Sequence, residues 1–380
     1  MAAPSLPVTA ATLAMPIADQ IRAFESVEFP QPFLRQTLFP NEHIFRSVAI
    51  QVIYNRLSRR LAPFVNLYQT GRILEGPPQT WQAITLPAFA PTRVLRSDDA
   101  LAPPPSCGFV SPNATDWIGQ IMATNLRDLE LSLSTREEWL CSQLLQFGRV
   151  EIVGDDPSDP AGHLTLNFEI NEPVSLSGSA AWNADPPPDI IAWLQSQCRA
   201  LAQKSGVRPD TLILGAEASA AFLANPAVMR ERTLLANIQD TAPEVEDSSV
   251  MFLGRFAALD CFEYDGIFLE SVLGEDGKYT DQVRDMIDPR SAILCSQAIP
   301  GSMCFGAISI TEDRAIQVYA AKRVPQSWAD RENGLWRQRL SSRFCPVPSD
   351  SASWQIFASV LTAPAIEAGS THGPAKNAKK

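Results

Sequence analysis

The chain has 380 residues, of which 45% are hydrophobic and 19% are charged, and its net charge at pH 7 is −11. A chain of this length can bury a large core. It has no basic block that would grip nucleic-acid phosphates, so direct DNA binding is disfavoured. No run of apolar residues is long enough to span a bilayer. Its seven cysteines are odd in number and form no CxxC, which indicates reduced, buried thiols made in a cytoplasm.

The first segments in chain order are expected to be extended. Residues 1–20 are rich in Ala, Pro, Thr and Ser, which predicts a flexible arm. FPQPFLRQTLFP (29–40) has prolines on both sides of its apolar residues and predicts an extended segment that docks through its aromatic side chains. SVAIQVIYNRL (47–57) predicts a strand. Repeated prolines exclude a helix from 70 to 112, and the apolar residues between them indicate a long loop that packs on another surface.

A long helix is predicted from 116 to 147, because apolar residues recur there at intervals of three, four or seven. At 1.5 Å per residue such a helix is roughly 48 Å long. Asn113 is a candidate N-cap, and Gly148 is a candidate stop. Arg136 and Glu137 interrupt the apolar stripe, which indicates a kink or a change of packing partner.

The second half of the chain alternates between strands and helices. RVEIV (149–153) and HLTLNFEI (163–170) predict a β-hairpin, and Asp189 and Gly206 predict the two ends of a helix. DTLILG, SAILCS and FGAISI read as strands, with two short helices after the first. Asp265-Gly266 is the dipeptide of this chain that most strongly indicates a hairpin turn. Two strand-like pieces follow near the C-terminus, and then a polar tail.

No constellation of reactive residues emerges. The three histidines, His43, His163 and His372, fall in unrelated segments, and no phosphate-binding or hydrolase motif occurs. Cys295 and Cys304 could meet across adjacent strands, but two small core residues are the favoured interpretation. Acidic stretches such as GDDPSD are typical of solvated turns. The sequence therefore predicts no catalytic, cofactor-binding or metal-binding residue, and its long extensions suit a subunit that reaches across neighbours.

Several stretches resemble, in order and spacing, the lambda-like capsid protein E family of tailed-phage major capsid proteins, which has the Hong Kong 97-type fold. FPQPFLRQTLFP resembles the segment after the family's N-terminal arm, MATNLRDLELSL the start of its spine helix, and FGRVEI the junction between helix and hairpin. RPDTLILGAEASAAFLANPAV, GRFAALDCFEYDGIFLES and MIDPRSAILCS are similar to its axial domain, and SSRFCPVPSDSASWQIFASVL to the return into its peripheral domain. The resemblance covers most of residues 29–362.

The resemblance implies an α+β fold built from successive segments. They are an N-terminal arm (1–46), a strand and extended loop (47–112), a peripheral domain with spine helix and hairpin (113–187), an axial domain (188–325), the peripheral return (326–362) and a flexible tail (363–380). The long helix would be the spine of one subunit, and the extended loop would lie over the next.

The resemblance also implies a structural, non-enzymatic protein of the virion. Its copies would form hexamers and pentamers of an icosahedral phage head, assembled in the host cytoplasm around the DNA genome. The implied partners are other copies, a scaffold or protease-scaffold protein, the portal, and packaged DNA bound without sequence specificity; a decoration protein is left open. Two alternatives stay open, an encapsulin-like compartment shell and a cytoplasmic enzyme that uses residues 188–325.

Four residues are candidates for packing between subunits: Phe33, Leu34, Trp81 and Phe89. We expect the apolar residues of the extended loop to find their partners only on another subunit. Some capsids of this fold join subunits through an isopeptide bond from a loop lysine, but the first lysine here is Lys204. Arginine is a poor nucleophile, so we expect a shell held by interlocked arms and loops or by an added decoration protein instead.

Overall fold

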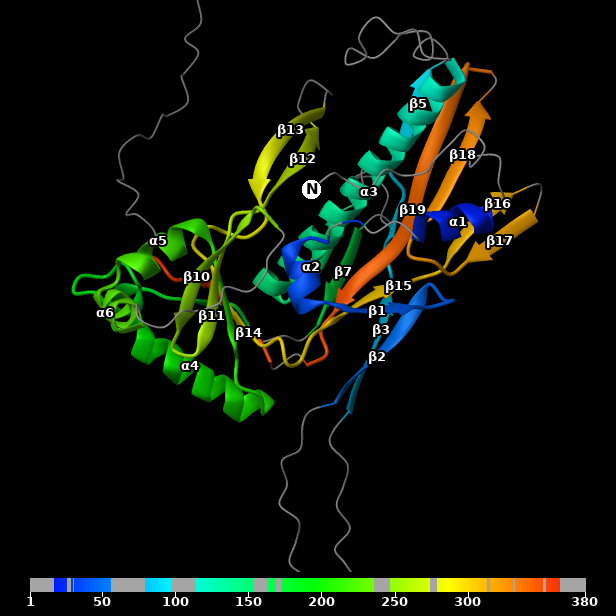
Figure 1. Ribbon diagram of the computed structural model, residues 1–380. Helices are drawn as coiled ribbons and strands as arrows, with labels where there is room; N and C mark the ends of the chain where they lie inside the picture. Colours follow the sequence, from blue (N-terminus) through cyan, green and yellow to red (C-terminus); the bar gives the residue numbers. More distant parts are fainter. Residues whose placement is uncertain are drawn as a thin grey trace, which may run out of the picture.

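The computed structural model describes residues 17–25, 29, 31–55, 79–96, 114–153, 163–168, 172–235, 247–273, 279–312, 315–330, 332–350 and 353–362. One long helix runs diagonally through the molecule, with a sheet on either side of it and several two-stranded hairpins at the periphery (Figure 1). The predicted flexible arm up to residue 16 and the predicted tail from residue 363 lie outside the described residues. Within these ranges, no helix combines the length and the apolar character that crossing a membrane requires.

The long helix, α3, spans Ala114–Phe147, which confirms the helix predicted from the apolar periodicity. It stops at Gly148, whose φ of 67° is a left-handed conformation that costs glycine little. The predicted cap, Asn113, lies outside the described residues. One apolar stripe of the helix is buried in the main core: Leu126, Leu129, Leu133, Leu140 and Leu144.

The N-terminal segments lie against this helix. They are α1 (Ile17–Glu25), α2 (Phe33–Leu38) and β1 (Asn41–Ile44). The expectation that residues 29–40 are fully extended is wrong, because α2 forms between the prolines. Pro32 stands at the N-cap with φ −62° and ψ 157°, where proline needs no N–H and starts a helix readily.

The extended loop begins and ends in a two-stranded stem. β2 (Ala49–Asn55) pairs antiparallel with β3 (Gln79–Thr85), and residues 56–78 between them lie outside the described residues. The next strands, β4 (Ala88–Phe89) and β5 (Thr92–Arg96), pair with β19 of the same chain. Ile84, Leu86 and Leu95 are therefore buried in their own subunit, and the expectation that this loop packs only on a neighbour is wrong for them.

The first sheet lies along α3. Its order is β1-β15-β19-β18, and β4 and β5 pair with other parts of the long strand β19. Its remaining strands are β15 (Ser302–Phe305), β18 (Val324–Asp330) and β19 (Leu335–Val347). Two hairpins accompany it: β6 (Arg149–Val153) with β7 (His163–Asn167), as predicted, and β16 (Ile308–Glu312) with β17 (Ala315–Tyr319).

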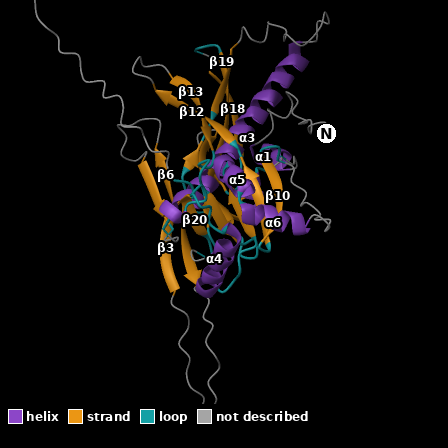
Figure 2. Ribbon diagram, turned by 90° about the vertical axis from the view of Figure 1, so that its left-hand side faces the viewer, coloured by secondary structure: helices purple, strands orange, loops and turns teal. Residues whose placement is uncertain are grey.

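The second sheet forms a separate layer with its own core. Its order is β10-β11-β9-β14-β20-β8. The strands are β8 (Val174–Ser175), β9 (Thr211–Leu214), β10 (Val250–Phe256), β11 (Leu259–Tyr264), β14 (Ala292–Cys295) and β20 (Gln355–Ser359). The 3-10 helix η4 (Gly178–Ala180) and the helices α4 (Ile190–Ser205), α5 (Ala216–Ala224) and α6 (Pro226–Leu235) belong to this half of the molecule (Figure 2).

The predicted ends of α4 are confirmed. The segments expected to form separate domains also exchange strands between the two sheets. Asp189 Oδ1 accepts the Ala192 N–H at 3.0 Å, and Gly206 ends the helix with φ 85°. β20 comes from the segment expected to return to the peripheral domain, yet it pairs with β14 in the second sheet. Conversely, β15 comes from the expected axial segment and lies in the first sheet. The division into domains stays a prediction.

The hairpin predicted at Asp265-Gly266 is wrong. β11 already has β10 on one edge and β9 on the other, so the strand that follows has no free edge of β11 to pair with. That strand, β12 (Ile267–Leu273), pairs with β13 (Tyr279–Asp285) instead. The turn between β10 and β11 uses Ala257 and Ala258, whose φ angles are 52° and 64°.

The strained alanine turn gives a first prediction. Ala258 is exposed and has a left-handed φ that alanine adopts only at a cost. Ala258→Gly should therefore raise the free energy of unfolding by about 1 kcal/mol, measured by urea denaturation. The control, Ala200→Gly at an exposed position of α4, should lower it by about 1 kcal/mol. Destabilisation by both substitutions would show that the turn is not strained.

Candidate functional site: a buried charge cluster on the long helix

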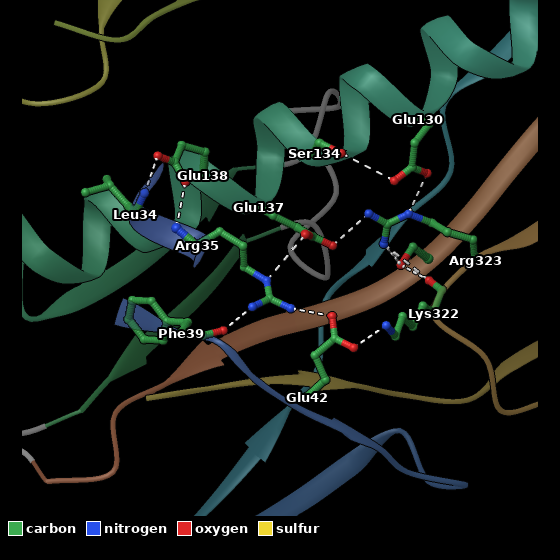
Figure 3. Close-up of polar contacts among 11 residues, drawn as sticks. Leu34, Arg35, Phe39, Glu42, Glu130, Ser134, Glu137, Glu138, Lys322 and Arg323 are labelled. Atoms are coloured by element: carbon green, nitrogen blue, oxygen red, sulfur yellow. Dashed lines mark hydrogen bonds and ion pairs between the residues drawn. The ribbon is translucent and has the colours of Figure 1, made fainter. Parts of the chain in front are cut away.

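Three carboxylates of α3 are buried: Glu130, Glu137 and Glu138. Two buried guanidinium groups, of Arg35 in α2 and of Arg323 directly before β18, lie beside Glu130 and Glu137, whereas Glu138 accepts backbone N–H groups of α2 (Figure 3). A buried charge is very costly unless it is paired and hydrogen-bonded. The local structure of these five residues is therefore set by their need for one another.

Arg323 joins the first sheet to the helix. Its Nε lies 2.8 Å from Glu130 Oε2, and its Nη2 lies 2.8 Å from Glu137 Oε1. Its Nη1 donates to Ser342 Oγ at 3.1 Å. Burial lowers the pKa of Arg323, but the two carboxylates raise it by more, so the guanidinium stays charged. Burial also raises the pKa of Glu130, against the opposing effect of Arg323.

Arg35 joins the N-terminal segment to the same helix. Its Nε is 3.7 Å from Glu137 Oε2, and its Nη2 is 2.7 Å from Glu42 Oε1. Its Nη1 donates to the carbonyl oxygen of Phe39, which fixes the chain after α2. The other oxygen of Glu42 pairs with Lys322. One continuous set of ion pairs thus connects α2, β1, α3 and the start of β18.

Glu138 of α3 fixes the start of α2 through hydrogen bonds. Its carboxylate accepts the backbone N–H groups of Leu34 at 2.8 Å and Arg35 at 3.0 Å, and the hydroxyl of Tyr264 at 2.9 Å. Burial raises the pKa of Glu138 to about 7, although the three donors act in the opposite direction. Burial and the neighbouring Glu138 both raise the pKa of Tyr264, so that side chain remains a donor. Glu138 therefore links the N-terminal segment, the long helix and the second sheet.

The cluster is suited to holding segments together rather than to chemistry. Its five charged groups are buried, and each contacts an opposite charge or a hydrogen-bond donor within the chain. The described part of the chain contains no group of histidine, cysteine and acidic side chains that could hold a metal ion. The buried thiols are unreactive as well, since burial raises the pKa of Cys304 to about 11 and that of Cys345 further.

The four residues predicted to pack between subunits are not brought together. Phe33 and Leu34 are buried in the main core of their own chain, where the ring of Phe33 lies 5.3 Å from that of Phe262. Phe89 is half-buried, with its ring 4.7 Å from that of Phe344. Trp81 is 62% exposed on β3. Packing between subunits stays a prediction for all four, although Phe33, Leu34 and Phe89 also have partners within their own chain.

One feature of the sequence indicated the charge cluster in advance. Arg136 and Glu137 interrupt the apolar stripe, and Glu137 is one of the three buried carboxylates. Arg136 lies over the rings of Phe89 and Trp139, and Glu137 faces Arg323. α3 continues through this point as one helix, and a kink or a change of packing partner there stays a prediction. Cys295 and Cys304 lie in different sheets and are both buried, which agrees with their interpretation as core residues.

Comparisons with known proteins agree with this architecture. A family model described as phage major capsid protein E matches residues 17–356. The structure is similar to that of a prophage protein from E. coli CFT073 that is described as a capsid protein, with a TM-score of 0.60 and 15% identity, covering 86% of this chain and 93% of that one. The predicted α+β, Hong Kong 97-type fold is confirmed. None of the curated proteins matches the sequence.

Two further structures align along most of their length. A phage-related protein from Bordetella bronchiseptica RB50 has a TM-score of 0.47 and 16% identity, covering 88% of this chain and 95% of that one. The SrpI encapsulin of Synechococcus elongatus PCC 7942 has a TM-score of 0.43 and 12% identity, covering 91% and 95%. Both TM-scores are too low to support a conclusion about this chain. The similarity to the encapsulin therefore does not favour an encapsulin-like compartment shell.

The buried ion pairs give a second prediction. Arg323→Met keeps much of the side-chain volume but leaves Glu130 and Glu137 buried with one cation fewer. It should lower the free energy of unfolding by about 3–5 kcal/mol, measured by urea denaturation. Arg149→Met removes an exposed cation paired with Glu151 and should cost under about 1 kcal/mol. Equal, small losses for both variants would contradict a structural role for the cluster.

Glu138 gives a third prediction, on pH. Its pKa is raised from 4.5 to about 7 in the folded protein, so its contribution to stability is complete below pH 4.5 and is lost as the pH rises through 7. Relative to Glu138→Gln, the wild-type protein should lose about 3 kcal/mol between pH 4.5 and pH 8. Urea denaturation of both proteins across this range measures the difference. A wild type that gains on the variant as the pH rises would show that the three donors outweigh burial.

Proposed function

This chain belongs to the phage major capsid protein E family, and we propose that its copies form hexamers and pentamers that close into an icosahedral head around the DNA genome. The chain is a structural subunit of a phage head, and the observation that carries this conclusion is the family match over residues 17–356. As a capsid protein it belongs to the virion.

The geometry supports assembly by interlocking. The interior is fixed by buried charges, whereas three two-stranded hairpins project from it: β2–β3, β12–β13 and β16–β17. Each carries large apolar side chains that the chain itself leaves exposed, among them Trp81, Leu269 and Ile316. An isolated two-stranded hairpin is only marginally stable in water. Neighbouring copies that cover these faces would stabilise the hairpins and the shell together.

The proposal assigns no enzymatic role to this chain. Its partners would be other copies, a scaffold or protease-scaffold protein during assembly in the host cytoplasm, the portal, and packaged DNA. The net charge of −11 fits a container that holds DNA without binding its sequence.

The direct test is assembly of the full chain. It should be produced alone and together with the neighbouring head genes, and the products examined by negative-stain electron microscopy. Closed, uniform shells in at least one condition are expected. Monodisperse monomers in every condition would overturn the proposed function.

A fourth prediction separates assembly from folding. Trp81 is exposed in the subunit, so Trp81→Ala should leave its melting temperature within about 2 °C of wild type while lowering the yield of shells. Phe89 contacts Phe344 within the chain, so Phe89→Ala should instead lower the stability of the subunit by about 1–3 kcal/mol. Calorimetry on the free subunit and particle counts after assembly measure both effects. Full shell yield for Trp81→Ala would contradict its place in a contact.

A further inference from the structure

The β12–β13 hairpin has one face that the chain does not cover. Its register places Leu269 opposite Val283 and Ile267 opposite Asp285, so these four side chains share a face. Ile267, Leu269 and Val283 are 60%, 65% and 64% exposed. Asp281, two residues before Val283, lies on the same face and is exposed. The face is therefore apolar at its centre and acidic at both ends.

The opposite face of this hairpin has partners within the chain. The ring of Phe268 lies 6.5 Å from that of Trp139 on α3, and Glu270 pairs with Arg284 at 2.5 Å. The hairpin thus stands on α3 through one face and presents the other away from the helix. We call the outward face, formed by Ile267, Leu269, Asp281, Val283 and Asp285, the acidic face.

A second outward face lies on the first sheet, where β19 runs between β18 and β5. The inner face contacts α3: Gln338 donates to the Met122 carbonyl at 3.3 Å, and Arg93 pairs with Asp128 at 3.0 Å. The alternation of side chains along a strand places the next residue, Arg337, on the other face, opposite Trp328 of β18 and Val94 of β5.

Arginines surround the apolar side chains on this outer face. Arg339 lies with its guanidinium carbon 5.2 Å from the centre of the Trp328 ring, and Arg337 pairs with Asp330 at 3.2 Å. Arg96, opposite Leu335, is exposed on the same face. Trp328 and Val94 remain 36% and 44% exposed. We call the face formed by Val94, Arg96, Trp328, Arg337 and Arg339 the basic face.

The two faces complement each other in charge. The acidic face has two aspartates, Asp281 and Asp285, whereas the basic face presents Arg337, which is paired with Asp330, and Arg339, so the two faces differ in the sign of their charge. Each also has an exposed apolar centre. A specific contact between proteins typically buries an apolar centre away from water and places opposite charges around it.

The two faces cannot meet within one chain. Two residues of α3 contact this hairpin. Trp139 packs against Phe268 of β12, and Gln146 donates to the carbonyl of Met286, the residue after β13, at 2.8 Å. At about 100° per residue, both lie roughly opposite Glu137, which contacts Arg323 beside β18. In Figure 1 the hairpin and the strands β18 and β19 accordingly lie on opposite flanks of α3.

We propose that the acidic face of one copy packs against the basic face of the next copy in the shell. The contact is heterologous, so each subunit uses both faces once and the copies follow one another around a ring. The proposal rests on the proposed function and specifies which surfaces of neighbouring subunits meet. A second copy is the partner because both halves of the contact are present on every subunit, with charges of opposite sign.

Charge reversal with rescue tests the contact. Asp281→Arg with Asp285→Arg makes the acidic face basic, and Arg337→Glu with Arg339→Glu makes the basic face acidic. Each double variant should lower the yield of shells about tenfold or more, because like charges then oppose each other. The variant with all four substitutions should recover wild-type yield to within about threefold. Arg149→Glu with Glu151→Arg, outside both faces, serves as the matched control and should assemble normally.

Folding is measured separately on free subunits by thermal denaturation. Arg337 and Arg339 have partners within the chain, so a second variant, Val94→Glu, introduces negative charge on the same face without removing a polar contact. It too should lower yield and be rescued by Asp281→Arg with Asp285→Arg.

The outcomes distinguish this contact from the function on which it rests. Wild-type yield for the variants of either face would overturn the contact alone. Failure of every combined variant to recover would show that a different partner covers a face, and would also overturn it. Absence of shells from the wild type in every condition would overturn the proposed function itself.

Discussion

The guanidinium of Arg323, held between Glu130 and Glu137, is the interaction on which the arrangement of the subunit depends. It fixes the first sheet against α3 through two ion pairs beside the rings of Phe305 and Phe344. Arg35 pairs with Glu137 and so fixes the N-terminal segment to α3 in the same way. Glu138 binds that segment through the Leu34 N–H and the second sheet through the Tyr264 hydroxyl. Each carboxylate would be costly to bury alone, so these segments hold one another in a single register.

This constraint explains how the subunit uses its longest helix. α3 receives apolar packing along one stripe and charged contacts beside it, and it thereby serves as the common support for both sheets. The hairpins contribute some side chains to that interior, among them Ile50 and Ile84, but each of the three that project also has an exposed apolar face. Their exposed apolar faces are the part of the molecule left for other copies, which is what a head subunit requires.

The sequence could predict elements whose signals are local. The apolar period of α3, the cap at Asp189 and the hairpin of β6 and β7 depend on neighbouring residues and were predicted correctly. The Asp265-Gly266 turn failed because pairing partners are chosen globally: both edges of β11 are taken by distant strands. The cluster escaped prediction for the same reason, since Arg35, Glu137 and Arg323 are separated by long stretches of chain and no spacing rule connects them. Phe33 and Leu34 look like exposed anchors only until the surface that covers them is known.

The central claim is that buried charges make the N-terminal segment an integral part of the subunit. Hydrogen exchange of the free subunit tests it most directly, through the amides of Leu34 and Arg35, which donate to Glu138. The account predicts that these amides exchange as slowly as those in the middle of α3, because both open only when the subunit unfolds. Fast exchange of Leu34 and Arg35 beside a protected α3 would contradict it.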